Sequence, residues 1–171
     1  MIRNQDMSVK SDKMSKSGAG FESEVKLAMQ EKPDWFYRQS GVIPYRLAEN
    51  GPEVLLVTSR RHKHWVIPKG IVEPQLSPRA SASQEAWEEA GLHGCILPDS
   101  VGCFSYKKWG GVCRVEVFLM AVEELDDQWP EASMRTRKWF PLREAISRVK
   151  YGGLADLLGR LPTLLNCPER K

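Results

Sequence analysis

Three glutamates lie close together in a segment with helical character: Glu85, Glu88 and Glu89, within residues 77–90. Because an α-helix turns about 100° per residue, this i, i+3, i+4 spacing puts the carboxylates on one arc, roughly 6 Å apart. At an effective dielectric of about 20, each pair then repels by about 2–3 kcal/mol. Exposure to water and salt relieves such repulsion and is the ordinary explanation of the pattern. A hard divalent cation relieves it better, because Mg²⁺ binds carboxylates and keeps waters that a phosphate can displace.

The glutamates belong to a longer pattern, in which Gly70 precedes Glu85 by fifteen residues and Gly91 follows the last glutamate. This pattern resembles the Nudix box, G-x5-E-x7-R-E-U-x-E-E-x-G-U, where U is apolar. Leu76 stands where the box has Glu, and Gln84 stands where it has Arg, which in the family orients the neighbouring carboxylate. Gln donates hydrogen bonds but brings no charge. These two departures leave open a domain that binds a nucleotide or polyphosphate without turning it over.

Segments on both sides of the box also resemble one Nudix branch, which contains the diphosphoinositol polyphosphate phosphohydrolases and diadenosine polyphosphate hydrolases. They are residues 38–46, 54–60, 65–70, 129–131 and 137–140, and a helix from Glu144. The resemblance implies a Nudix α/β/α sandwich with a mixed central sheet, of the α/β (α+β) class. We place this domain at residues 33–165.

The activity that the resemblance implies is Mg²⁺-dependent hydrolysis of a phosphoanhydride, with Mn²⁺ as an alternative cation. Water attacks one phosphorus in line, and a phosphate or phosphate ester leaves. By the same resemblance, the metal ligands are Glu85, Glu88, Glu89 and the carbonyl of Gly70. The general base differs between Nudix branches, so the catalytic candidates are Glu85, Glu89 and Glu116, the last in a strand opposite the box. For Glu116 the alternative is a cross-strand ion pair on a solvated face.

The substrate that this branch implies is a small, highly anionic molecule such as a diphosphoinositol polyphosphate or a diadenosine polyphosphate. ADP-ribose or a nucleoside-diphosphate sugar is the alternative. Arg and Lys donors form charge-assisted bonds with phosphate oxygens, and a basic run at residues 60–64 lies just before the box, although a solvated loop would also explain it. The substrate-binding candidates are Arg46, Arg60, Arg61, Lys63 and Lys69, and Lys107 and Lys108 could add to them.

Aromatic side chains could offer stacking surface for a base, although most buried tryptophans belong to a core. The candidates are Trp35, Phe36, Trp65, Trp109 and Trp139.

The elements that would position these residues follow from turn signals and apolar runs. We expect strands at residues 37–48, interrupted by Gly41 and Pro44, and at residues 53–59, 65–67, 102–108, 112–122 and 138–140. A Gly110-Gly111 turn would join the fourth and fifth of these. Ser77 as N-cap, Pro78 at the first helical position and Gly91 after the last turn frame the box helix. Further helices are expected at residues 142–150 and 154–165, the second broken or ended near Pro162. We expect residues 1–32 to be a flexible polar tail, in which residues 21–30 could form a short helix, and residues 166–171 to be a second tail.

Composition supports one soluble globular domain: 171 residues, 42% hydrophobic and 27% charged. A net charge of +3 gives no indication that the chain binds long nucleic acid, and the longest apolar run, residues 117–122, is too short for a membrane span.

The four cysteines form no CxxC pair, which argues against a zinc ribbon, and a disulfide between Cys103 and Cys113 stays open. Without the apolar region of a secretory signal, we expect a cytoplasmic monomer or homodimer with reduced thiols.

Overall fold

The structure is a computed structural model that describes residues 32–61 and 63–165. The tails expected at residues 1–32 and 166–171, with the helix at 21–30, therefore lie outside the described residues except for Lys32, as does His62. In the described part, no helix has both the length and the apolar character needed to cross a membrane.

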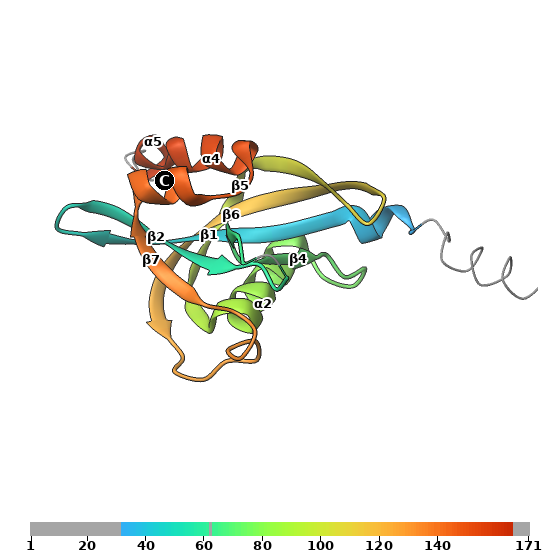
Figure 1. Ribbon diagram of the computed structural model, residues 1–171, viewed down its shortest axis with the longest axis horizontal. Coiled ribbons are helices and arrows are strands. Elements are labelled where there is room, and N and C mark those ends of the chain that lie inside the picture. The colour runs from blue at the N-terminus through green and yellow to red at the C-terminus, as the bar shows by residue number, and fades with distance from the viewer. Residues whose placement is uncertain (1–31, 62, 166–171) are drawn as a thin grey trace, which may run out of the picture. The chain divides into compact units, whose positions relative to one another are not determined.

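Seven strands form one mixed sheet around β1 (Arg38–Ala48), in the order β3-β2-β1-β6-β5 (Figure 1). The others are β2 (Gly51–Thr58), β3 (Trp65–Val66), β4 (Lys69–Ile71), β5 (Leu92–Lys108), β6 (Gly111–Leu125) and β7 (Arg137–Pro141). β4 also pairs with β1 and β7 with β2, and a short 3-10 helix, η1 (Asp34–Tyr37), leads into β1. Only β1 and β6 are parallel; the other named pairs are antiparallel.

The central strand β1 runs without a break through Gly41 and Pro44, contrary to the expected interruption. A Cβ on Gly41 would collide with the carbonyl of Pro68 and the side chain of Lys69. The glycine therefore permits the close approach of β4 rather than ending the strand, because a glycine in a strand often marks such an approach.

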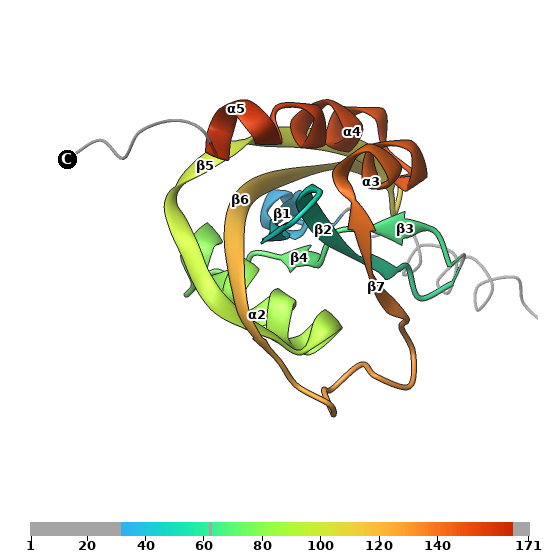
Figure 2. The same ribbon diagram turned by 90° about the vertical axis from the view of Figure 1, so that its left-hand side faces the viewer.

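Helices cover both faces of the sheet, as Figure 2 shows. α2 (Pro78–Ala90) lies on one face, and α3 (Leu142–Arg148), α4 (Gly152–Gly159) and α5 (Leu161–Leu165) lie on the other. Two separate hydrophobic cores fill the two interfaces. The core under α2 uses the small residues Ala82, Ala86 and Ala90, whereas the core under the other helices is rich in leucine. The α/β/α sandwich with a mixed sheet is thereby confirmed.

The helix that carries the three glutamates begins and ends where its sequence signals predict. The Ser77 hydroxyl accepts a hydrogen bond from the Ala80 amide at 3.2 Å, and Pro78 is the first helical residue. Gly91 ends the helix in the left-handed conformation, at φ +60°. Local capping chemistry therefore fixes the register of the glutamates relative to β4.

The β5–β6 hairpin differs from the expectation. β5 begins at Leu92, ten residues before the expected start. Register shifts between residues 93 and 102 interrupt the alternation of buried and exposed residues, and the sequence therefore does not reveal this part of the strand. The turn is Trp109-Gly110, at φ +54° and +79°, and not Gly110-Gly111. Cys103 and Cys113 are free thiols: Cys103 pairs across the ladder with Glu116 and Cys113 with Tyr106, so the two cysteines are not opposite each other.

Candidate active site

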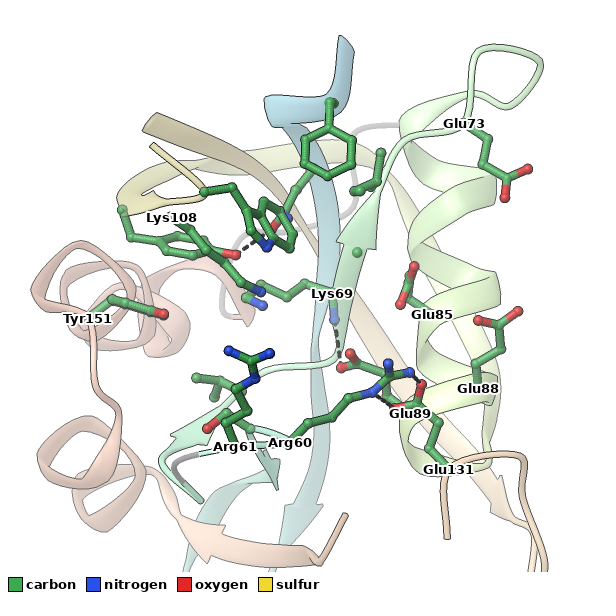
Figure 3. A pocket seen from close by; sticks show the side chains of 18 of the residues that line it. Arg60, Arg61, Lys69, Glu73, Glu85, Glu88, Glu89, Lys108, Glu131 and Tyr151 are labelled. Atoms are coloured by element: carbon green, nitrogen blue, oxygen red, sulfur yellow. Dashed lines mark hydrogen bonds and ion pairs between the residues drawn. The ribbon is translucent and has the colours of Figure 1, made fainter. Parts of the chain in front are cut away.

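A cavity of about 1130 Å³ brings together residues from almost every part of the domain. α2 contributes Glu85, Glu88 and Glu89, and the segment after β2 contributes Arg60 and Arg61. The rest of the lining comes from η1, β1, β3, β4 and the loop after it, the end of β5 and its turn into β6, the β6–β7 connection and the link between α3 and α4. In Figure 3 the glutamates of α2 stand along one side, and Lys108 and Tyr151 lie on the opposite side.

Gly70 lies directly against the carboxylate of Glu85. A Cβ built on Gly70 would overlap both carboxylate oxygens, so no other residue fits there without moving Glu85. Gly70 reaches this position because β4 pairs with the buried start of β1, where Gly70 is opposite Ser40. The sequence spacing of fifteen residues therefore corresponds to a direct contact between β4 and α2.

Glu89 is buried and held from both sides. One of its carboxylate oxygens is ion-paired to Arg135, and the other accepts a hydrogen bond from the Lys69 amide at 3.1 Å. Arg135 also pairs with Glu131 at 2.5 Å and donates to the Thr58 carbonyl at 2.9 Å. Since the Arg135 and Glu89 side chains expose only 8% and 6% of their surface, this network orders the base of the cavity.

The ionisable groups of the cavity are shifted by burial. Burial, to which the Glu89 and Glu88 carboxylates add, raises the pKa of Glu85 to about 7. Burial also raises the pKa of Glu89, although Lys69 and Arg135 oppose that shift. It lowers the pKa of Lys69, against the attraction of Glu89.

Gln84, which replaces the arginine of the box, still contacts a carboxylate. Its amide nitrogen donates to Oε1 of Glu88 at 2.8 Å, one helical turn away. Arg135, far away in sequence, supplies a buried positive charge to Glu89 instead. The cavity therefore has both an orienting hydrogen bond and a guanidinium, from two different residues.

The basic residues of the cavity outnumber the acidic ones. We call the following set the basic side: Arg60, Arg61, Lys69, Lys107, Lys108, Arg135 and Lys150. Five carboxylates line the same space, those of Glu73, Glu85, Glu88, Glu89 and Glu131. Arg60 is ion-paired to Glu131, and Arg135 to both Glu131 and Glu89. Of the substrate-binding candidates, Arg60, Arg61 and Lys69 are thus brought to the cavity.

Two of the substrate-binding candidates from the sequence lie elsewhere. Arg46 pairs with Glu53 at 2.6 Å near the far end of the β1–β2 hairpin, roughly 20 Å along β1 from Ser40. Lys63 donates from Nζ to the carbonyl of Met134 at 2.6 Å and does not line the cavity. The sequence of a basic run or of a strand does not reveal in which direction a side chain points, so charge alone does not separate Arg46 and Lys63 from the basic residues of the cavity.

Glu116 lies on the sheet face that α2 covers, since its strand neighbours Val115 and Val117 belong to the other core and Phe118 belongs to the core under α2. It is opposite Ser40 in the sheet, two strand spacings, or about 10 Å, from Gly70. Glu116 is not among the residues that line the cavity.

Sequence reasoning missed several residues that the fold adds to the cavity. Arg135 and Glu131 come from the β6–β7 connection, and no local pattern marks them as buried. Tyr106 and Tyr151, from β5 and the α3–α4 link, stack with ring centroids 4.5 Å apart, and the Tyr106 hydroxyl donates to Gln39 at 2.7 Å. Only the long-range packing of the sheet identifies these four.

The donor chemistry of this region fits a hard divalent cation. Carboxylates of α2 and the Gly70 carbonyl are oxygen donors of the kind that Mg²⁺ prefers, and the Glu85 carboxylate packs directly against Gly70. The side chains do not converge as they stand: among the described residues, no three His, Cys, Asp or Glu are arranged to hold an ion. Glu89 accounts for part of this, because both of its oxygens are engaged, and Glu85 and Glu88 would have to turn toward a bound ion.

The sequence and the fold of this chain are similar to those of known proteins. Residues 37–157 match the NUDIX domain model. Nudix hydrolase 13, mitochondrial, of Arabidopsis thaliana is 32% identical over 141 residues, which cover 70% of each chain. Human diphosphoinositol polyphosphate phosphohydrolase 3-alpha is 33% identical over 117 residues, covering 67% of this chain and 70% of the relative. The crystal structure of C. elegans Ap4A hydrolase superposes with a TM-score of 0.64 at 27% identity, over 75% of this chain and 97% of that one.

The match to the family model covers the box, the sheet around β1, the helices α2 and α3 and most of α4. The positions of Gly70, Glu85, Glu88 and Glu89 in one cavity agree with the spacing of the Nudix box despite Leu76 and Gln84. The chain belongs to the Nudix family of hydrolases.

Proposed function

We propose that this protein is a Mg²⁺-dependent pyrophosphohydrolase that cleaves a phosphoanhydride bond in a small, highly anionic substrate. The observation that carries the proposal is the pairing, in one cavity, of the acidic face of α2 with the basic side. Carboxylates suit a divalent cation, while arginine and lysine suit the phosphate oxygens around it. Polyphosphate substrates need both at once, and a binding site for a neutral ligand needs neither.

The substrate class draws support from the relatives. The matched human phosphohydrolase is named for diphosphoinositol polyphosphates and the C. elegans hydrolase for a diadenosine polyphosphate. The first compound carries phosphates around an inositol ring, and the second carries a chain of phosphates between two nucleosides. A cavity of about 1130 Å³ with seven lining cations can accommodate either. ADP-ribose carries fewer charges and would leave more of the basic side unpaired.

We assign the cation to Glu85, Glu88, Glu89 and the Gly70 carbonyl. Bound Mg²⁺ would neutralise phosphate charge and make a water more acidic. Glu85 is the carboxylate best placed to take the proton of the attacking water, because both oxygens of Glu89 already accept hydrogen bonds from Arg135 and Lys69. Glu89 also holds the Lys69 amide and Arg135 in place, and because a carboxylate has about four lone-pair sites, these two bonds leave sites for the cation. Arg61, Lys107 and Lys108 bind the non-bridging oxygens and the charge that develops on the leaving phosphate.

Turnover by the purified protein with Mg²⁺ tests this assignment. The panel is a diphosphoinositol polyphosphate, a diadenosine polyphosphate, ADP-ribose and a nucleoside triphosphate, with products separated by anion exchange. Glu88→Gln should lower kcat about 100-fold, since it removes part of several kcal/mol of charge stabilisation. Glu123→Gln, at an exposed position of β6 outside the cavity, is the matched control and should keep wild-type turnover.

Three results would separate the alternatives. Cleavage of a polyphosphate that Glu88→Gln abolishes supports the proposal. Preferential cleavage of ADP-ribose would move the protein to the diphosphate-sugar class. Tight binding of a polyphosphate without turnover, equal in wild type and Glu88→Gln, would refute the proposal and show a domain that binds without hydrolysing.

A further inference from the structure

Three aromatic side chains line the cavity and come from outside the box: Trp35 and Phe36 of η1 and Trp109 of the β5–β6 turn. We call them the aromatic rim. The ring centroids of Phe36 and Trp109 lie 4.8 Å apart, and those of Trp35 and Phe36 lie 6.1 Å apart. Trp35 and Trp109 each keep 44% of their surface exposed. Two segments that are more than 70 residues apart in the sequence, but adjoin the neighbouring strands β1 and β6, thus present adjoining rings at one site.

Packing of the domain core does not account for these rings. None of the three belongs to the hydrophobic core on either face of the sheet. A half-exposed tryptophan gives up part of the stabilisation that full burial would bring. Two of them beside one cavity form an apolar surface that is available to a ligand.

The backbone holds Trp109 in an unfavourable conformation at this position. Its φ of +54° lies in the left-handed region, which bulky side chains rarely adopt and where hairpin turns favour Asn or Gly. The Tyr37 hydroxyl donates to the Trp109 carbonyl at 3.2 Å, and the Tyr37 ring occupies the space that a side chain on Gly111 would need. Residues in such conformations persist where surrounding contacts enforce them, often at ligand sites.

Cations adjoin the aromatic rim. Lys107 and Lys108 line the same cavity, and the Lys108 ammonium lies 3.9 Å from the centroid of the Trp109 ring. A ligand that used both features would have a flat ring joined to a chain of phosphates. A nucleoside polyphosphate has this chemistry, because every nucleobase has a π-face that can stack on an aromatic side chain. An inositol polyphosphate has a saturated ring surrounded by phosphates, which offers no such face.

We propose that Trp35 and Trp109 form a stacking platform for a nucleobase, and that the substrate of this enzyme is therefore a nucleoside or dinucleoside polyphosphate. This inference rests on the proposed function and narrows its substrate class. Trp35 lies just before residues 37–157, the part that matches the family model, whereas Trp109 lies within it.

Binding of two probes that differ by one nucleoside tests the platform, because only the tryptophan variants report on the base rather than on the ribose. Adenosine tetraphosphate and inorganic tetrapolyphosphate carry the same number of phosphates, and titration calorimetry in chelator measures both without hydrolysis. The wild type should bind the adenosine probe between about 5-fold and about 150-fold more tightly, the range expected for stacking one base. Trp109→Ala and Trp35→Ala should bring that ratio toward one, and Trp109→Phe should largely restore it.

Trp87→Ala is the matched control, because Trp87 is a similarly exposed tryptophan, at 43%, that does not line the cavity. It should leave the ratio unchanged. If the wild type binds the two probes with equal affinity, the proposal is overturned. This outcome does not depend on whether the variants fold. An unchanged ratio in both folded alanine variants would overturn it as well.

The two proposals can fail separately. If the protein cleaves a diphosphoinositol polyphosphate while the base adds nothing to binding, the hydrolase assignment stands and the platform falls. If the base strengthens binding in the predicted manner but no substrate turns over, the platform stands and the hydrolase assignment falls.

Discussion

Replacing Glu85 with glutamine removes a carboxylate whose charged form is disfavoured by burial and by two neighbouring glutamates. In the folded protein, burial and the neighbouring Glu89 and Glu88 carboxylates raise the pKa of Glu85 from 4.5 to about 7. The folded state therefore holds the Glu85 proton more tightly than the unfolded chain does. The stability that this gives is fully present below about pH 4.5 and is lost as the pH rises toward 7.

The size of the loss follows from the shift. A difference of this size between folded and unfolded pKa values corresponds to at most about 3 kcal/mol above pH 7. Glutamine has nearly the same shape and carries no charge at any pH. In chelator at pH 8.5, Glu85→Gln should thus be more stable than wild type by up to about 3 kcal/mol, which is roughly 10 °C in Tm for a domain of this size. Near pH 4.5 the two proteins should melt together.

Thermal unfolding followed by circular dichroism, in chelator at both pH values, measures this difference. Glu123→Gln controls for the loss of one carboxylate at an exposed position. Saturating Mg²⁺ at pH 8.5 should then stabilise the wild type more than Glu85→Gln, because a cation at 100 times its Kd adds about 2.7 kcal/mol to a protein that binds it. A wild type that is the more stable protein in chelator at pH 8.5 would refute this reasoning.

Three other changes test the rest of the site. Arg135→Gln should cost about 3–5 kcal/mol in urea unfolding, because it leaves the buried Glu89 without its ion-pair partner and removes one of the two arginines paired to Glu131; a shift below about 1 kcal/mol would contradict that network. Gly70→Ala should displace the Glu85 carboxylate and lower kcat at least tenfold in a protein whose circular dichroism is unchanged, so retained turnover would count against the Glu85 assignment. Arg61→Ala should raise KM about tenfold for a polyphosphate with little change in kcat, and the effect should shrink in high salt.

Short-range signals made α2 predictable to the residue. The Ser77 cap, Pro78 and Gly91 act within a few residues of the helix they frame, so the sequence alone locates the helix ends and the glutamate register. The beginning of β5 could not be found in the same way. Its ladder with β6 contains irregular steps near Gly94 and Gly102 that remove the alternation on which strand prediction depends.

The residues of the candidate site also fall into those that short-range patterns identify and those that only the tertiary structure brings in. The motif identified Gly70 and the three glutamates, since their relation is fixed by one strand, one loop and one helix. Arg135 is 46 residues from its partner Glu89, and its role depends on how the β6–β7 connection folds back under α2. Charge alone favoured Arg46 over Arg135, although Arg46 forms its ion pair within a distant hairpin. Pairings of this kind require the tertiary structure.

The parallel pairing of β1 with β6 has a consequence for synthesis of the chain. Residues 49–110 separate the two strands, and a ribosome adding about 5–20 residues per second needs several seconds to produce them. During that time the backbone N–H and C=O groups on the edge of β1 that faces β6 have no strand partner, and such an unpaired edge can associate with other chains. We therefore expect nascent chains that end before Leu125 to bind chaperones, and the cavity to become competent for ligand only after the β5–β6 hairpin has left the ribosome.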